Sequence, residues 1–241
     1  MIEFLYGMLI LCSYFIICAL IAVTCRKLFK IPDEIFRKIL HFILLTSVFI
    51  LFYAYDTWWI SVITCIVFMV VVFPVLMLFE SFKTYSKVVT ERKKGELKIS
   101  LLLVFSMFAG VIALTYGYFN DRLLGLAVIF SWGYGDALAA LIGTKFGKYK
   151  IYKKKSLEGT LAMFITALIT ILVILFIRGM IPWYGIVVTA VITSLVVSIV
   201  ELFTPNGLDT VTCPLASMVV MILLLMLFGG FWWKKLVKKQ C

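Results

Sequence analysis

Long apolar runs, separated by short polar and basic segments, extend through the whole chain. A helix that crosses a bilayer needs about 20 consecutive, mostly apolar residues. Eight runs approach this length, at residues 4–25, 39–54, 58–79, 99–119, 122–143, 160–178, 183–203 and 212–233. The pattern therefore predicts an all-α integral membrane protein, a polytopic bundle of about eight transmembrane helices, in a single membrane-embedded domain over residues 1–241.

Composition and charge agree with a membrane location. Hydrophobic residues make up 64% of the chain and charged residues 15%, and the mean hydropathy is +1.13, which lies outside the range of soluble globular proteins. The formal net charge is +11. Because the positive charges lie between the apolar runs, attraction to anionic membrane lipids explains them, and we expect no nucleic acid partner.

The basic residues also predict the orientation. If the N-terminus lies outside, the loops at residues 26–38, 80–98 and 144–159 face the cytoplasm, and they hold 17 of the 23 Lys and Arg residues, in line with the positive-inside rule. Loop 80–98 has the pattern of a helix lying in the interface. With eight spans the C-terminal lysines fall outside, so a broken or re-entrant element near 201–214 is an alternative that returns the C-terminus to the cytoplasm.

Two acids, Asp136 and Glu201, lie inside apolar runs. An acid in the middle of a membrane span costs about 2.5–3.5 kcal/mol on insertion scales, so it marks a functional site unless a basic residue of a neighbouring helix pairs with it. On a helix, Asp136 shares one face with the small residues Ala139, Ala140 and Gly143. Such residues allow a second helix to approach closely.

Glycines and a turn suggest a metal site. Gly133 and Gly135 permit a break in the helix before Asp136, which would expose backbone groups to a polar cavity. A carboxylate in such a cavity is a natural ligand for magnesium. Glu201 and Asp209 flank a Pro-Asn-Gly turn that could bring both acids toward one metal, although an ordinary turn with an exposed Asp209 explains the same pattern.

The segment GTKFGKYKIYKKKSLEGT combines glycines with six lysines. Backbone amides beside glycines, and the start of a helix, can hold phosphate oxygens, while lysine supplies positive charge. The same segment predicts a helix start with Ser156 as the N-cap and Gly159 or Thr160 in the first turn. The chain has no P-loop pattern, which argues against the architecture of soluble P-loop kinases.

A third polar cluster, in DEIFRKILHF, leads into the second apolar run. Its members are Glu34, Arg37, Lys38 and His41, at helical spacings of three and four. His41 is the single histidine of the chain. It is either a polar anchor at the membrane interface or a general base.

Three motifs resemble the polyprenol kinase family, which includes dolichol kinase, phytol kinase and the CTP-dependent diacylglycerol kinases. The stretch GDALAALIGTKFGKYKIYKKKSLEGTLAMF is similar to the signature region of the family. RKILH and ELFTPNGLDTVTCPL are similar to two further motifs, except that Thr210 stands where the family usually has asparagine. The three motifs are spread over about 180 residues. A looser similarity extends to the CDP-diacylglycerol synthases.

The resemblance implies a kinase domain that depends on Mg²⁺ and transfers the terminal phosphoryl group of CTP, or another nucleoside triphosphate, to the hydroxyl of an isoprenoid alcohol or diacylglycerol. We expect its active site to face the cytoplasm. If the source is prokaryotic, we expect the protein in the cell membrane. The expected catalytic residues are Asp136, His41, Arg37 and Lys38, and the expected metal ligands are Asp136, Glu201 and Asp209. The expected nucleotide-binding residues are Gly135, Gly143, Lys145, Gly147, Lys148, Lys155, Ser156, Glu158 and Gly159.

Two other functions fit the same residues. A phosphatidate cytidylyltransferase (CDP-diacylglycerol synthase) would use the same metal and lysines but would release pyrophosphate and a CDP-lipid. A lipid or ion transporter would use the intramembrane acids along a path, but these acids gather toward the predicted cytoplasmic ends and the sequence has no visible inverted repeat. The acceptor lipid, the choice between CTP and ATP, and a homodimeric state stay open.

Overall fold

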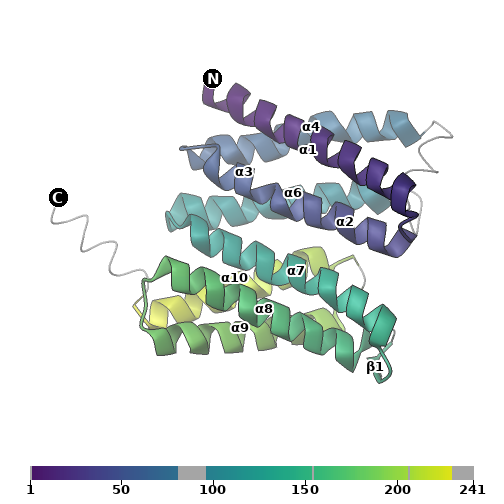
Figure 1. Ribbon diagram of the computed structural model, residues 1–241. Coiled ribbons are helices and arrows are strands. Elements are labelled where there is room, and N and C mark those ends of the chain that lie inside the picture. Colours follow the sequence, from purple (N-terminus) through teal and green to yellow (C-terminus); the bar gives the residue numbers. More distant parts are fainter. Residues whose placement is uncertain (1, 81–95, 154, 206, 230–241) are drawn as a thin grey trace. The chain divides into compact units, whose positions relative to one another are not determined.

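The computed structural model describes residues 2–80, 96–153, 155–205 and 207–229 (Figure 1). Within these residues, eight helices are long and apolar enough to cross a membrane. Most of loop 80–98, with its expected interfacial helix, and the C-terminal lysines lie outside the described residues.

The eight helices match the predicted runs in order and closely in position. They extend over Ile2–Phe29, Asp33–Tyr53, Trp58–Val75, Lys98–Tyr118, Arg122–Phe146, Leu157–Arg178, Trp183–Phe203 and Asp209–Leu227. The prediction of an all-α, polytopic integral membrane protein is thereby confirmed. The segment 201–214, for which a broken or re-entrant element is the alternative prediction, contains a turn that joins two helices of spanning length.

The helices group into two compact units, a first unit of Met1–Gly117 and a second unit of Tyr118–Cys241. In the first unit, α1 contacts α2, α3 and α4, and α4 packs against α6. Its described elements are α1 (Ile2–Phe29), α2 (Asp33–Thr46), α3 (Val48–Tyr53), α4 (Trp58–Glu80), α6 (Glu96–Ile112) and the π-helical turn η1 (Ala113–Tyr118). Aromatic rings fill part of its core, and the stacked rings of Phe68 and Phe105 lie 4.7 Å apart. The expectation of one domain over the whole chain stays a prediction.

The second unit is a four-helix bundle whose main contacts follow the ring order α7, α8, α9, α10, with a smaller contact between α7 and α9 (Figure 1). Its elements are α7 (Arg122–Phe146), β1 (Lys150–Tyr152), β2 (Lys155–Ser156), α8 (Leu157–Arg178), α9 (Trp183–Phe203) and α10 (Asp209–Leu227). The antiparallel strands β1 and β2 form a short hairpin between α7 and α8. The hairpin carries Lys155 and Ser156, and the turn between α9 and α10 separates Glu201 from Asp209.

The expected break before Asp136 does not occur, because α7 runs without interruption from Arg122 to Phe146. The glycines there serve close packing instead. A Cβ atom on Gly135 would lie 2.3 Å from the sulfur of Met163 on α8, so a larger residue at this position would have to displace the Met163 side chain. A continuous helix also keeps its backbone hydrogen bonds internal, which the membrane environment favours.

The small face next to Asp136 confirms the prediction of close helix approach. A Cβ atom on Gly159 of α8 would lie 3.0 Å from the carbonyl oxygen of Ala139 and 3.4 Å from the Cα atom of Gly143, both on α7. Small residues allow this backbone proximity. Gly143 and Gly159, which the sequence assigns to nucleotide binding, thus have a packing role.

We expect the substitution Gly147→Ala to destabilise the protein by about 1–3 kcal/mol, the usual cost of overpacking. The new Cβ atom would lie 2.2 Å from the carbonyl oxygen of Gly143, which belongs to the backbone and cannot move aside. The matched control is Gly110→Ala in α6, where no atom lies within 4 Å. This control should be neutral or stabilise the protein, because alanine favours helix more than glycine does. Thermal unfolding in detergent compares the two, and equal midpoints would contradict the prediction.

A buried ion pair, which sequence analysis did not predict, connects the start of α7 to the end of α8. The guanidinium Nε of Arg178 lies 2.7 Å from Oδ2 of Asp121, and the two side chains are 1% and 4% exposed. Asp121 also caps α7 by accepting a hydrogen bond from the backbone N–H of Leu124 at 3.1 Å. One carboxylate therefore stabilises the helix start and neutralises a buried cation.

Candidate functional site

The loop between α7 and α8 is held by two side chains at the start of α8. Ser156 is the N-cap and accepts a hydrogen bond from the backbone N–H of Gly159 at 3.2 Å, which confirms that prediction. Glu158, in the first helical turn, accepts hydrogen bonds from the backbone N–H groups of Lys148 and Tyr149 at 3.1 and 3.3 Å. Two consecutive amides thus point at one carboxylate.

Lys155, at the end of the hairpin, pairs with Glu201 of α9. Its ammonium nitrogen lies 2.8 Å from a carboxylate oxygen of Glu201, and it also donates to the backbone carbonyls of Glu201 and Thr204. Three acceptors match the three N–H donors of an ammonium group. Because α9 ends at Phe203, the cation also lies where the helix dipole favours positive charge.

This contact joins two residues that the sequence assigns to different roles. Lys155 is expected to bind phosphate and Glu201 to bind metal, but in the structure they neutralise each other. The sequence offered the alternative that a basic residue of a neighbouring helix pairs with an intramembrane acid. Glu201 is paired in this way, but its partner Lys155 belongs to the hairpin and not to a helix. Side-chain exposures of 19% for Lys155 and 10% for Glu201 leave the pair within reach of solvent.

The three expected metal ligands lie on three helices of the second unit that contact one another, α7, α9 and α10. Cys213 of α10, one helical turn after Asp209, is fully buried. Asp136 belongs to α7, Glu201 to α9 and Asp209 to α10, so all three acids are part of the second unit.

Carboxylates suit Mg²⁺, which is bound by oxygen ligands. Among the residues that the structure describes, no group of three or more His, Cys, Asp and Glu side chains converges on one metal position. Mg²⁺ does not require such a group, because it usually keeps several waters and takes only one or two protein carboxylates together with substrate phosphates. The chemistry of the three acids therefore fits a magnesium site that a bound substrate completes.

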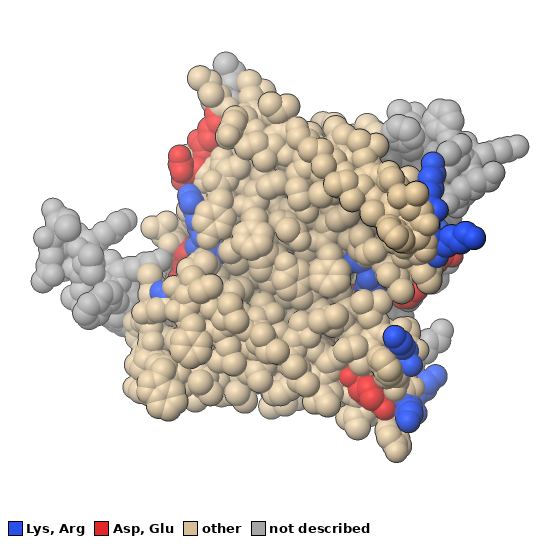
Figure 2. Space-filling view, in the orientation of Figure 1, with Lys and Arg blue, Asp and Glu red and all other residues tan. Residues whose placement is uncertain are grey.

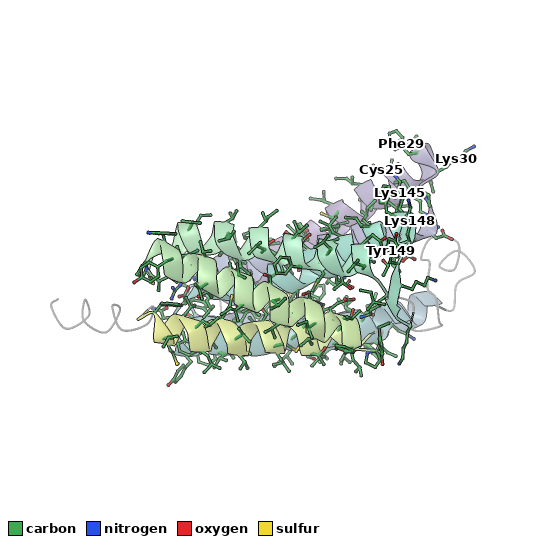
Figure 3. All side chains as sticks on the ribbon, turned by 90° about the horizontal axis from the view of Figure 1, so that it is seen from below. Cys25, Phe29, Lys30, Lys145, Lys148 and Tyr149 are labelled. Atoms are coloured by element: carbon green, nitrogen blue, oxygen red, sulfur yellow. The ribbon has the colours of Figure 1, made fainter. Side chains whose placement is uncertain are left out.

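Exposed lysines lie at the end of α7 and in the loop that follows it. Figure 3 shows Lys145, Lys148 and Tyr149 close to one another where α7 ends, and both lysines are exposed. Lys145 lies over the ring of Phe146, with 5.2 Å from its nitrogen to the ring centre. On the face shown in Figure 2, charged side chains gather beside the β1 hairpin, whereas the surface over α8 is almost free of charge. The exposed lysines expected to bind phosphate are thus at the end of the bundle that carries the β1 hairpin.

The predicted catalytic residues of α2 belong to the first unit. Arg37 forms an ion pair with Glu34 at 2.7 Å, Lys38 is 7% exposed, and His41 is partly buried. Their spacing on one helix is as predicted. Whether they approach Asp136 stays a prediction, because Asp136 lies in the second unit.

The fold defines a class, namely an α-helical polytopic integral membrane protein, and its candidate site joins an acid of α9 to a lysine-bearing hairpin. Comparison of the chain with protein-family models, with curated proteins and with solved structures gave no match. A particular function must therefore follow from the chemistry of the site.

Proposed function

We propose that the protein is a lipid alcohol kinase that uses CTP or another nucleoside triphosphate and acts on an isoprenoid alcohol or diacylglycerol. The observation that carries this proposal is the contact of Lys155 with Glu201, which brings the lysine-bearing hairpin between α7 and α8 to the end of α9. The other two acids, Asp136 and Asp209, lie on α7 and α10, which both contact α9. Acids for a divalent cation and cations for phosphate groups are the two requirements of phosphoryl transfer.

In the proposed site, Asp136 binds Mg²⁺, with Glu201 and Asp209 as further ligands. When bound, the metal neutralises charge on the phosphates. The exposed Lys145 and Lys148 orient the phosphate chain of the nucleotide. Catalysis of this kind depends on positioning and charge, so it needs no covalent intermediate with the protein.

The reaction proposed for this site moves one phosphoryl group to a lipid hydroxyl. The bond between the terminal phosphorus and its bridging oxygen breaks, and the lipid oxygen forms the new bond to phosphorus. Asp136 can take the hydroxyl proton. The alternative base His41, and Arg37 and Lys38 as holders of the negative charge of the product, stay predictions, because these three residues belong to the first unit. The lipid alcohol arrives from the membrane, and the site faces the cytoplasm, as the basic loops indicate.

The test uses purified protein in detergent with Mg²⁺, CTP or ATP labelled at the terminal phosphate, and a panel of lipid alcohols. Transfer of label into the organic phase with one alcohol is the expected result, and it names the acceptor. A parallel reaction with phosphatidate measures pyrophosphate release, which would indicate the cytidylyltransferase reaction instead. Movement of a lipid or ion across liposomes without nucleotide use, together with no labelled lipid, would point to a transporter.

A further inference from the structure

Two carboxylates of the chain occupy positions at which an anion would bind. The carboxylate of Glu158 accepts hydrogen bonds from the consecutive backbone amides of Lys148 and Tyr149. The carboxylate of Glu201 lies on the ammonium group of Lys155 at 2.8 Å. Both positions belong to the segment that connects α7 to α8, one before β1 and one in β2.

Each position has the donors that phosphate oxygens require. Successive backbone N–H groups that point to one spot form a concave anion site, as in many phosphate-binding loops. An ammonium group with three donors binds phosphate as readily as carboxylate. The donors are therefore general for oxyanions, and the structure fills them with acidic side chains of the protein itself.

We propose that Glu158 and Glu201 are internal stand-ins for phosphate groups. A phosphate chain that binds at the hairpin takes the amides of Lys148 and Tyr149 from Glu158, and takes the ammonium group of Lys155 from Glu201. This inference rests on the proposed function of the same site. It adds which donors the phosphate chain takes over from the protein's own carboxylates when it binds. The displaced Glu201 carboxylate then becomes available to the cation that accompanies the phosphates.

Position and charge support the exchange. Lys148 and Tyr149 are exposed, and Lys155 keeps 19% of its side chain accessible, so an anion can reach all three from solvent. The lysines exposed around this segment attract a polyanion, and they are Lys145, Lys148, Lys150 and Lys153. Each stand-in carboxylate repels the incoming phosphate, so its removal should strengthen binding.

The test is the binding of inorganic tripolyphosphate to purified protein in detergent, measured by calorimetry in a chelator-containing buffer without divalent cations. We expect Glu158→Gln and Glu201→Gln each to bind tripolyphosphate about tenfold more tightly than the unmodified protein, which is the size of one like-charge contact at a partly exposed site. An ordinary stabilising contact would give no such gain.

The matched control is Asp33→Asn, which makes the same change in charge. Asp33 also forms an ion pair, with Arg26 at 2.6 Å, and its side chain is 67% exposed. Because Asp33 lies in α2 of the first unit, away in the chain from the hairpin, its substitution should leave the affinity within about twofold, as expected of an exposed pair. An equal gain in this control would overturn the proposal, since it would reduce the effect to net charge.

Glu158→Gln decides the test, because Glu158 is partly exposed and its substitution leaves no buried charge unpaired. Unchanged, weaker or undetectable tripolyphosphate binding by this variant overturns the proposal, whether or not Glu201→Gln folds. A second arm uses short-chain phosphatidate, and a gain with this ligand alone assigns the stand-in positions to a lipid phosphate. If the unmodified protein phosphorylates a lipid but Glu158→Gln binds tripolyphosphate with unchanged affinity, only the stand-in role is overturned. If Glu158→Gln binds tripolyphosphate more tightly but the unmodified protein phosphorylates no lipid, only the proposed function is overturned.

Discussion

Replacement of Asp136 by asparagine is expected to lower kcat/KM for lipid phosphorylation at least about a hundredfold. Residues that only orient a metal ligand already cost about 10- to 100-fold when mutated, so the loss of a ligand itself should cost more. The same variant should be as stable as the unmodified protein or more so, because it removes a charge from a membrane span. Activity, magnesium dependence and thermal unfolding are measured on one preparation.

A catalytic role of Asp136 predicts a lower kcat/KM without a loss of thermal stability, so the two measurements together distinguish a catalytic from a structural role. If Asp136 served only as a buried ion-pair partner, the variant would unfold at a lower temperature and keep its magnesium dependence. Full turnover with an unchanged magnesium titration would remove Asp136 from the proposed site. Asp33→Asn, with the same loss of charge in an exposed pair, should leave both activity and stability near those of the unmodified protein.

The largest expected effect on stability comes from the buried pair of Asp121 and Arg178. Arg178→Met leaves the carboxylate of Asp121 buried without its cation, and we expect a loss of about 3–5 kcal/mol, as for other buried pairs with one partner removed. The unfolding midpoint in detergent should fall accordingly. Asp33→Asn is the control, because it breaks a pair of similar geometry whose carboxylate is 67% exposed, and such a pair is worth less than about 1 kcal/mol.

A double variant tests the physical reason for this effect. Asp121→Asn combined with Arg178→Met removes both charges, while asparagine can still cap α7 through its side-chain oxygen. We expect the double variant to recover most of the stability lost in Arg178→Met, because no charge is left uncompensated. A double variant that is no more stable than the single one would show that the cost arises from lost packing.

The spanning helices could be predicted because each obeys a local rule. A membrane span must satisfy its own backbone hydrogen bonds and needs a minimum apolar length, whatever surrounds it. The N-cap of Ser156 is equally local, since it depends on a serine three residues before the amide of Gly159. The prediction of a helix break at Gly133 and Gly135 was wrong, because glycine permits a break without requiring one. The absence of a side chain at Gly135 instead makes room for Met163 of α8.

Pairings between distant residues could not be predicted. Lys155 and Glu201 are 46 positions apart, and Arg178 and Asp121 are 57 positions apart. For each basic residue the sequence offers several acids at comparable distances, and nothing local selects among them. The selection follows from which helices are neighbours in the bundle.

The sequence by itself determined the membrane class, the number and limits of the spans, the small face beside Asp136 and the capped start of α8. Tertiary structure alone decided that the helices of Asp136, Glu201 and Asp209 contact one another, and that Lys155 is held by Glu201. The physical reason is the range of the interactions. Hydrophobic length and helix caps act over a few neighbouring residues, whereas ion pairs between helices depend on how α7, α9 and α10 pack around one another.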